Sequence, residues 1–535
     1  MLSLATLGSL AVCSLAGLAQ AYDNDAMRSK AVYQVLTDRF ATSDGSTTQP
    51  CDVSAMSYCG GTYKGLAGKL DYIKGMGFDV IWISPIVSNI GGNTSLGESY
   101  HGYWTQDIYS LNEAFGSEAD LKDLISQAKA KDMGIMVDVV VNHVAATASG
   151  NFIPNDSYGP FNSTAQYHPF CWVDDYNNQT NVEQCSLGNT DVTLQDLDTE
   201  DPNVVQIFNS WIKGLIADYG FEAIRIDTVK HVRKDFWPAF VDAAGVYAVG
   251  EVLDGYPPYV AAYQKQSMDS VFNYPVYFPL KAAFNSTSGN MSALSEMVTT
   301  LTTTFDDTTM LGNFLDNHDN SRFEATVNDK MLIMNAATFP FVSDGIPYVY
   351  YGQEQGFTGG EIDYENREAM WLSNFNTETD MYKHFGKLNT ARSVMGQAQP
   401  SFYTTKASIA DSTDSEIAIS KPPMLSVLSN RGAGSGSNTM KLNNLAYDAN
   451  TQLLDVIGCK TYSTNGDKSL DVTVQDGAPQ VFVPASLNQD NKICSSTATG
   501  SSSGGDSKSA GFVDAKIPVV AGAMTVLAGL FLTMF

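Results

Sequence analysis

Residues 203–227 read NVVQIFNSWIKGLIADYGFEAIRID. The first part, 203–220, has the apolar periodicity of a helix, and the second part, 221–227, is a short run typical of a buried strand. Residues 117–132, SEADLKDLISQAKAKD, have the helical pattern again. Strand-like runs alternate in this way with helical segments over most of the chain, which predicts an α/β fold.

The strand candidates number eight. They are AVYQVL (31–36), FDVIWISPI (78–86), GIMVDVVV (134–141), FEAIRID (221–227), VYAVGEV (246–252), SVFNYPVY (270–277), MLGNFLD (310–316) and IPYVYYG (346–352). Eight strands with intervening helices favour a closed (β/α)8 TIM barrel over an open sheet. In such a barrel the functional side chains lie at the carboxyl ends of the strands.

Two segments depart from a minimal barrel. Residues 143–200 follow the third strand, are rich in Asn, Asp and Tyr, and contain their own cysteine pair, so we expect a protruding loop domain, here called domain B. From 399 to 495, β-rich segments replace the alternation and predict a C-terminal antiparallel β-sandwich domain. The barrel then consists of two parts, residues 22–142 and 201–398.

The composition is that of a large, acidic globular protein. The chain has 535 residues, of which 44% are hydrophobic and 17% charged, so it can form a large core. Lys and Arg number 31 against 58 Asp and Glu, which gives a net charge of −27. This charge repels phosphate backbones and anionic lipid, so we expect no nucleic-acid partner, and it is compatible with a neutral or cationic substrate. We expect a monomer.

Both ends of the sequence predict targeting. Residues 1–21 form an apolar run with a small-x-small end and predict a secretory signal peptide, with a buried N-terminal helix as the alternative. Residues 496–516 are a Ser/Gly-rich linker, and 517–535 are an apolar tail without a following charge. This order is typical of a GPI signal with attachment between Ser503 and Ser509 and removal of the tail; a membrane-spanning tail helix is the alternative. The chain is therefore expected to be secreted and GPI-anchored to the outer plasma membrane or the cell wall.

The cysteines indicate an oxidising compartment. Six remain beyond the signal peptide and fall in three local pairs, which predicts the disulfides Cys51–Cys59, Cys171–Cys185 and Cys459–Cys494. The sequence has no CxxC pair, so a zinc site has no support. Six Asn-x-Ser/Thr sequons fit a secreted glycoprotein: Asn93, Asn155, Asn162, Asn178, Asn285 and Asn290.

Polar residues end four of the strand candidates. They are Asp138-Val139-Val140-Val141-Asn142-His143, Arg225-Ile226-Asp227, Gly250-Glu251-Val252 and Asp316-Asn317-His318-Asp319. Arg225 and Asp227 are two residues apart and face the same way, so the arginine keeps the carboxylate ionised, as a nucleophile requires. Glu251 follows an apolar strand, where burial raises a carboxyl pKa and favours a general acid. A nucleophile and a proton donor on adjacent strands are what a retaining glycosidase needs.

These motifs resemble a known family. DVVVNH (138–143), GFEAIRIDTVKH (220–231), GEVLDG (250–255) and FLDNHDN (314–320) resemble the four signature regions of the α-amylase family of glycoside hydrolases. Three longer stretches are similar to fungal α-amylases of the Taka-amylase type: YHGYWTQDIYSLNEAFG (100–116), IDTVKHVRKDFWPAF (226–240) and GIPYVYYGQEQ (345–355). The resemblance covers about residues 22–495.

The resemblance implies roles for individual residues. It implies that Asp227 is the nucleophile, Glu251 the general acid/base, and Asp319 a third carboxylate that holds sugar hydroxyls and stabilises the transition state. The matching sugar-binding positions are His101, Tyr103, Trp104, His143, Arg225, Lys230, His231, Gly255, His318, Asp363 and Arg367. It also implies a structural Ca²⁺ between the barrel and domain B, with oxygen ligands from Asn142, Glu183, Asp196 and the backbone carbonyl of His231.

The predicted function is retaining endo-hydrolysis of α-1,4-glucosidic bonds in starch-like α-glucans at the fungal cell surface. A 4-α-glucanotransferase is the first alternative, because transfer to a sugar acceptor uses the same three carboxylates. The terminal signal agrees with this alternative as well, since it resembles that of wall-anchored fungal amylases and glucanotransferases. A non-catalytic protein that binds wall α-glucan is the second alternative, and the presence of all three carboxylates argues against it.

Overall fold

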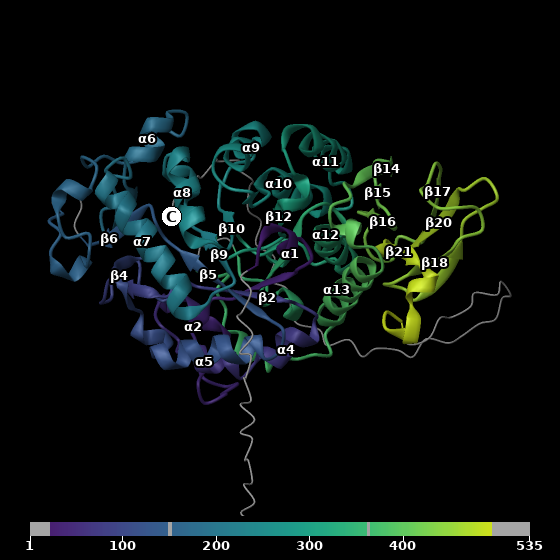
Figure 1. Ribbon diagram of the computed structural model, residues 1–535. Coiled ribbons are helices and arrows are strands. Elements are labelled where there is room, and N and C mark those ends of the chain that lie inside the picture. The colour runs from purple at the N-terminus through teal and green to yellow at the C-terminus, as the bar shows by residue number, and fades with distance from the viewer. Residues whose placement is uncertain (1–21, 148–151, 361–363, 495–535) are drawn as a thin grey trace, which may run out of the picture.

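The computed structural model describes residues 22–147, 152–360 and 364–494. The predicted signal peptide, linker and terminal tail lie outside these residues, as does Asp363. Figure 1 shows a central barrel, domain B with β6 and α6 on its left, and the C-terminal domain with β17 and β18 on its right. In the described part of the chain, no helix combines the length and the apolar character needed to cross a membrane.

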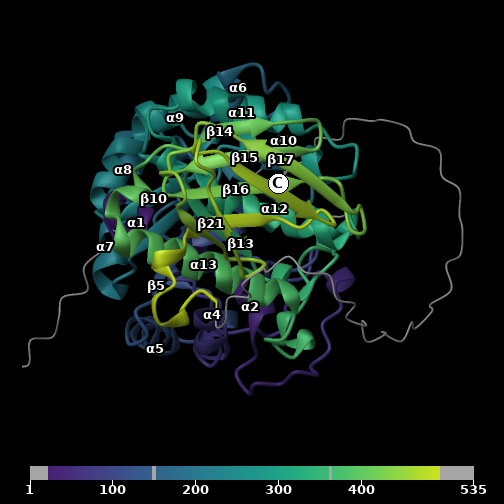
Figure 2. The same ribbon diagram turned by 90° about the vertical axis from the view of Figure 1, so that its right-hand side faces the viewer.

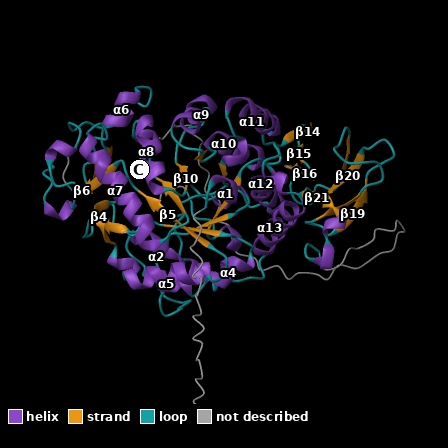
Figure 3. Cartoon of the chain, viewed as in Figure 1, coloured by secondary structure: helices purple, strands orange, loops and turns teal. Residues whose placement is uncertain are grey.

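The centre of the molecule is a closed parallel barrel. Its eight strands are hydrogen-bonded in the order β11-β10-β9-β5-β2-β1-β13-β12, and a parallel bridge between Phe272 and Gly312 closes the ring. The strands are β1 (Val32–Gln34), β2 (Val80–Ile83), β5 (Gly134–Val139), β9 (Ala223–Ile226), β10 (Tyr247–Gly250), β11 (Ser270–Val271), β12 (Gly312–Asn313) and β13 (Ile346–Tyr350). Helices surround these strands (Figure 3), so both faces of the sheet are buried. The predicted (β/α)8 barrel is confirmed.

The two helices predicted from periodicity form with defined ends. α5 (Glu118–Lys129) begins after Ser117, and the side chains of Ser117 and Asp120 each accept from the other's backbone N–H. α7 (Pro202–Tyr219) ends at Gly220, whose φ of 71° suits a residue without a Cβ atom. The remaining helices are α1 (Asn24–Arg28), α2 (Thr37–Phe40), α3 (Tyr63–Ala67), α4 (Leu70–Gly75), α8 (Trp237–Ala244), α9 (Pro257–Gln266), α10 (Tyr274–Phe284), α11 (Met291–Thr304), α12 (Lys330–Val342) and α13 (Asp380–Ala398), besides α6 of domain B.

The sixth barrel strand is shorter than predicted. The run SVFNYPVY predicts a strand over 270–277, but only its first two residues form β11, and Phe272 adds a single bridge. Asn273 accepts from Val276 N as the cap of α10, and Pro275 lies in the first turn of that helix. A capping residue followed by proline therefore ends the strand and starts a helix inside the apolar run.

Domain B is a small unit beside the barrel. Its three strands pair in the order β6-β8-β7, and a small apolar cluster that includes Val182 and Leu187 packs around Cys171 and Cys185. Its elements are β6 (His143–Ala146), α6 (Gln179–Gln184), β7 (Leu187–Gly188) and β8 (Thr193–Asp196); the hairpin of β3 (Val87–Asn89) and β4 (Thr105–Leu111) precedes them in the chain. Because β6 follows β5 within a few residues, domain B stands at the carboxyl ends of the barrel strands.

The C-terminal domain consists of antiparallel strands, as predicted. A six-stranded sheet has the order β14-β15-β16-β21-β18-β19, and β17 pairs with β20 in a separate ribbon. Side chains from both, among them Val427, Met440 and Phe482, share one apolar core. In Figure 2 this sheet lies in front of α12. The strands are β14 (Ser408–Ser412), β15 (Glu416–Lys421), β16 (Met424–Ser429), β17 (Ser437–Leu442), β18 (Gln452–Asp455), β19 (Lys460–Ser463), β20 (Leu470–Gln475) and β21 (Gln480–Pro484).

Buried polar contacts fix the C-terminal domain to the barrel. Lys421 Nζ lies 2.8 Å from Asp344 Oδ1, and both side chains are almost inaccessible to solvent. Asn335 of α12 donates to Gly477 O and accepts from Ser429 N, both at 2.8 Å. Because separation would leave these polar groups without partners, the two parts are expected to unfold together.

The three predicted disulfides are confirmed. Cys51–Cys59, Cys171–Cys185 and Cys459–Cys494 are all bonded. The six sequon asparagines are exposed, so a glycan could be attached at each, and their glycosylation stays a prediction.

A cavity of about 510 Å³ lies at the end of the barrel opposite domain B. Its lining includes Ala31 and Asp79, which directly precede β1 and β2, and Lys492, near the end of the described chain. The last described residues therefore lie at the amino ends of the barrel strands.

Candidate active site

Polar side chains from several barrel strands meet in one cavity at the carboxyl ends of the strands. Asp227 follows β9, Glu251 follows β10, and Asp319 lies in the segment after β12. The cavity has a volume of about 100 Å³ and is lined by His101, Tyr103, Trp104, His143, Leu194, Asp227, Thr228, Glu251, Leu253, His318, Asp319 and Arg367. The structure thus brings together the three predicted carboxylates and most of the predicted sugar-binding residues. Leu194, Thr228 and Leu253 were not predicted.

A buried arginine joins the carboxylates. Arg225 Nη1 lies 2.7 Å from Asp227 Oδ1 and 3.0 Å from Asp138 Oδ1. Its Nη2 lies 2.8 Å from Glu251 Oε2. Asp227 and Glu251 bind the two terminal nitrogens of one planar group, so they are held side by side in a fixed orientation.

Asp138 is a further carboxylate in this network, and sequence reasoning gave it no role. It is 2% exposed and accepts from Tyr103 Oη at 2.7 Å and from Trp82 Nε1 at 3.0 Å. With Arg225, these donors hold Asp138 from three separate segments of the chain. The only sequence signal was the acidic residue in an otherwise apolar strand, and its partners could not be read from spacing.

The general-acid candidate is in an apolar environment. Burial raises the pKa of Glu251 to about 8, and the charges of Asp227 and Asp319 act in the same direction while Arg225 opposes them. Thr228 N donates to Glu251 Oε2 at 3.1 Å, which fixes the carboxyl group in place. At neutral pH most of the Glu251 side chains carry a proton that can be donated.

Neutral histidines surround the cavity. Burial lowers the pKa values of His101, His143 and His318, so their rings are uncharged hydrogen-bonding groups. The Tyr103 ring stacks on His318 with 5.0 Å between the centroids, and Tyr103 O lies 3.2 Å from His143 Nε2. The Trp104 ring meets His101 edge to face at 4.8 Å. Flat aromatic surfaces with neutral polar atoms at their edges suit an uncharged, hydroxyl-rich ligand.

Arg367 and Asp319 form the remaining wall. Arg367 Nη2 lies 4.0 Å from Asp319 Oδ1, and Arg367 Nη1 donates to Tyr100 Oη at 3.3 Å. His318 Nε2 lies 3.3 Å from Asp319 Oδ2. Asp319 is therefore oriented from two sides, and burial raises its pKa.

Some predicted sugar contacts lie outside the cavity lining. Lys230 Nζ donates to Leu253 O at 2.8 Å, which places this residue just behind the wall. Gly255 lies against the Phe278 ring. The His231 ring has its Nδ1 3.0 Å from Val182 O in domain B, so one ring nitrogen serves the contact between domain B and the barrel. Sugar binding by these residues and by Asp363, which is outside the described residues, stays a prediction.

Comparison with known protein families shows to which family the chain belongs. Residues 34–395 match the model described as alpha amylase, catalytic domain, and residues 401–502 match the model described as alpha-amylase, domain C. The chain belongs to the alpha-amylase family.

Named relatives in this family cover nearly the whole chain. An alpha-amylase of Saccharomycopsis fibuligera is 44% identical over 471 residues, 88% of this chain and 94% of that protein. Alpha-amylase 1 of Schwanniomyces occidentalis is 42% identical over 474 residues, 88% of this chain and 92% of that protein. The solved structure of an alpha-amylase from Malbranchea cinnamomea is 44% identical with a TM-score of 0.85, and the match covers 87% of this chain and 98% of that one. The chain is thus a glycoside hydrolase of the alpha-amylase family, which acts on α-glucans.

Three buried oxygen atoms of this family member converge where domain B meets the barrel. The amide oxygen of Asn142 faces the backbone oxygen of His231 at 2.8 Å and Asp196 Oδ1 at 3.2 Å. With Asp196 ionised, these three atoms are acceptors only, so they repel one another unless a cation binds between them or the amide turns its N–H₂ toward the other two. All-oxygen coordination is what Ca²⁺ prefers, so these residues fit the predicted ion. Glu183, the fourth predicted ligand, lies on α6 and accepts from Gln179 Nε2 at 2.7 Å.

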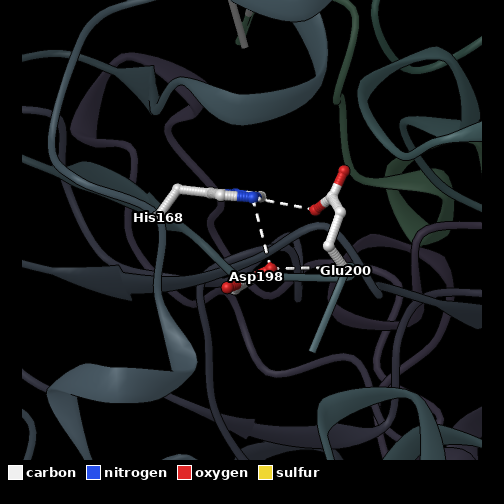
Figure 4. Close-up of side chains that lie close together, drawn as sticks. All are labelled: His168, Asp198 and Glu200. Atoms are coloured by element: carbon white, nitrogen blue, oxygen red, sulfur yellow. Dashed lines mark hydrogen bonds and ion pairs between the residues drawn. The ribbon is translucent and has the colours of Figure 1, made fainter. Parts of the chain in front are cut away.

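A charged cluster next to these oxygens is explained without a metal ion. His168 Nδ1 lies 2.6 Å from Asp196 Oδ2. Figure 4 shows the other side of the ring, where Nε2 lies 2.8 Å from Glu200 Oε2 and 3.4 Å from Asp198 Oδ1. The ligand atoms of His168, Asp198 and Glu200 are close enough to surround an ion. Although burial lowers it, hydrogen bonds to Asp196 and Glu200 raise the pKa of His168 to about 10. A protonated imidazole therefore pairs with these carboxylates.

Proposed function

We propose that the chain hydrolyses internal α-1,4-glucosidic bonds of starch-like α-glucans with retention of configuration. The observation that carries this proposal is the pairing of two unlike carboxyl groups on one guanidinium. Asp227 is held as an ion-paired carboxylate, while Glu251 has a pKa raised by burial to about 8. Retaining enzymes need the two groups about 5–5.5 Å apart, whereas inverting enzymes separate them by about 6.5–9.5 Å. Two carboxylates on adjacent nitrogens of one group favour the shorter spacing.

In the first step the sugar at the cleavage point lies between the two carboxyl groups. Glu251 donates its proton to the glycosidic oxygen as that oxygen leaves C1, and an Asp227 oxygen attacks C1 from the opposite face. Positive charge develops on the sugar ring at this point. The partly exposed Asp319 carboxylate stabilises it and holds sugar hydroxyls, and the neutral histidines donate and accept hydrogen bonds.

In the second step water takes the place of the departed chain. Glu251, now a carboxylate, takes a proton from the water, whose oxygen bonds to C1 as the bond from C1 to Asp227 breaks. Two inversions at C1 return the α configuration. Both carboxyl groups then have their starting protonation states.

The experiment that tests this function follows the anomer and the product length together. Maltopentaose incubated with the protein should give shorter maltooligosaccharides whose new reducing ends first appear as the α-anomer in proton NMR spectra. First appearance of the β-anomer would rule out the covalent route. An absence of any cleavage would rule out the enzyme activity itself and favour a glucan-binding protein.

We also propose that a Ca²⁺ ion holds domain B to the barrel. Asn142, Asp196 and the His231 carbonyl would bind it together with Glu183, and the ion would neutralise oxygens that now face one another. Its role would be structural, because these residues join domain B to the ends of barrel strands rather than facing the sugar.

Calcium should therefore stabilise the folded chain. Free Ca²⁺ at 100 times its dissociation constant raises the free energy of unfolding by about 2.7 kcal/mol, so chelation should lower Tm measurably. Asn142→Ala should melt at the temperature of the chelated protein and should not respond to added Ca²⁺. Asn177→Ala, an exposed position in the same domain, serves as the control and should respond like the original protein. If chelation leaves Tm unchanged, the Asn142 amide has turned to donate and no ion is needed.

We further propose that the chain is exported and held at the outer cell surface by a GPI anchor. The terminal sequence features support this, and three formed disulfides and six exposed sequons are compatible with an extracellular location. Deletion of residues 517–535 should release active protein into the medium. Full-length protein that is already found free in the medium would contradict the anchor.

A further inference from the structure

Positive charge gathers around the cavity of about 510 Å³ at the amino ends of the barrel strands. The charged side chains that line it are Lys30, Lys74, Asp79, Arg392 and Lys492. Four cations against one carboxylate give the described lining an excess of three positive charges, whereas the whole chain has a net charge of −27. The acidic surface elsewhere does not cancel this local field, because physiological salt screens charges over about 8 Å. The cavity is therefore attractive to an anion.

These cations come from four separate parts of the chain. Lys30 lies between α1 and β1, and Lys492 lies near the end of the described chain. Lys74 belongs to α4 and Arg392 to α13, and these two helices lie side by side in Figure 1 and in Figure 2. Folding brings like charges together here, and their repulsion is relieved when an anion binds between them.

Arg392 is the most buried of the four cations. It is 3% exposed, and its guanidinium donates to Phe341 O and to Arg28 O, both at the long distance of 3.4 Å. In the described part of the chain it belongs to no ion pair. Burial lowers the pKa of Arg392, while Tyr403 and Asp79 act in the opposite direction. A buried charge without a counter-ion is unfavourable, so an anion beside this guanidinium would stabilise it.

Uncharged polar groups lie beside Arg392. Asn389, Ser393 and Gln397 are four residues apart on α13 and line the same cavity. Among the described residues, no donor reaches the buried Oδ1 of Asn389. Buried acceptors are nearly always paired, and a ligand hydroxyl would supply the donor that this oxygen lacks. The lining therefore suits a ligand that carries hydroxyl groups as well as negative charge.

We propose that this cavity binds a phosphate group, either carried by a sugar or present as the free ion. A phosphate has several acceptor oxygens, which the planar guanidinium of Arg392 and the ammonium groups of the lysines can bind together. The volume of about 510 Å³ is within the range of about 300–1,000 Å³ that is typical of small-molecule sites. The site is separate from glucan cleavage, because the catalytic cavity lies at the other end of the barrel.

The test titrates the full chain with three probes in a calorimeter. Glucose 6-phosphate should bind and should raise Tm, because a ligand of the folded state stabilises it. Glucose, which has the same ring without the phosphate, should bind much more weakly. Inorganic phosphate separates the two sources of the group. Tighter binding of glucose 6-phosphate than of inorganic phosphate assigns the phosphate to a sugar, and equal binding assigns it to the free ion.

Charge variants locate the binding in this cavity. Lys492→Glu reverses an exposed charge of the lining, so it should fold normally and raise the dissociation constant of glucose 6-phosphate about three- to thirtyfold. Lys213→Glu makes the same change at an exposed position of α7 outside the lining, so it should bind like the original protein. Arg392→Met should bind neither phosphate probe. Both lysine variants should cleave glucan at the original rate.

Three results would overturn the proposal. They are an original protein that binds neither phosphate probe, equal affinities for glucose and glucose 6-phosphate, and equal affinities of Lys492→Glu and Lys213→Glu for glucose 6-phosphate. Because Lys492 is exposed, this comparison stays decisive even where Arg392→Met fails to fold. A loss of glucan cleavage without a change in phosphate binding would concern the proposed function and leave this site standing.

Discussion

Asp227→Ala should lose activity on both glucan and α-maltosyl fluoride, whereas Glu251→Gln should lose glucan cleavage but still release fluoride in its first turnover. Asp227 forms the covalent bond to C1, and no neighbouring group can replace it at that position. Glu251 protonates a poor leaving group, and general acid catalysis of this kind contributes about 10²–10⁴-fold. Fluoride departs without a proton, so Glu251→Gln should retain much of the first step with this donor. The first-turnover burst of fluoride and the initial rate of glucan cleavage measure the two responses, because the second step also needs the Glu251 carboxylate.

The pH dependence of glucan cleavage and of fluoride release tests the same roles of Asp227 and Glu251. The acid form of Glu251 is needed for glucan, so this activity should fall as the pH rises through about 8, the value to which burial raises its pKa. Release of fluoride should lack this alkaline limit. Asp235→Asn, at an exposed carboxylate, is the matched control and should keep both activities. Equal responses of Asp227→Ala and Glu251→Gln to the fluoride would show that the two roles are wrongly assigned.

Arg225→Met should be strongly destabilising as well as inactive. It removes the partner of three buried carboxylates, those of Asp138, Asp227 and Glu251. Breaking a buried ion pair from one side costs about 3–5 kcal/mol because a charge remains without compensation. Arg225→Lys keeps the charge but cannot donate from two fixed nitrogens, so it should recover part of the stability and little of the activity.

The loss of stability in Arg225→Met should depend on pH in a defined direction. Burial already raises the pKa values of Asp138 and Glu251 in the folded chain, and without the opposing guanidinium they rise further above those of the unfolded chain. The folded state then binds more protons, so the variant gains stability as the pH falls and loses it as the pH rises. Denaturant unfolding at pH 5 and pH 8 should show a smaller deficit at the lower pH. Arg233→Met, which removes a partly exposed pair with Asp235 and one hydrogen bond to Thr199 O, should cost no more than about 2 kcal/mol at either pH. Equal losses of stability in Arg225→Met and Arg233→Met would contradict the ion-pair network around Arg225.

The sequence predicts the ends of barrel strands well, for a physical reason. A strand buried on both faces must be apolar, so a polar residue such as Asp227 or Glu251 directly after it marks the rim of the barrel. The pairing of Arg225 with Asp227 follows from the alternation of side chains along β9. Contacts across strands do not follow from such patterns. Asp138 with its donor Trp82 therefore went unassigned, because they come from separate strands.

The sequence fails to predict secondary structure where a capping signal interrupts an apolar run or where the apolar pattern is weak. The run 270–277 is apolar enough for a strand, but Asn273 and Pro275 begin a helix within it. In the C-terminal domain, β14 and β19 cannot be recognised from the sequence, because their side chains are mostly exposed and polar and leave no apolar alternation. Each lies at an edge of the six-stranded sheet, where pairing with one neighbour is enough to keep the strand extended.

If the chain is anchored as proposed, the location of Lys492 determines which end of the barrel would face the surface. This residue lines the cavity at the amino ends of the barrel strands, whereas the catalytic cavity that contains Glu251 opens at their carboxyl ends. From Cys494 to the expected attachment region at 503–509, an extended chain spans at most about 30–50 Å. A protein tethered there would stay close to the surface, with the opening of the catalytic cavity facing away from it. Glucan chains approaching from the surroundings would then meet the mouth first, without having to pass between the enzyme and the surface that holds it.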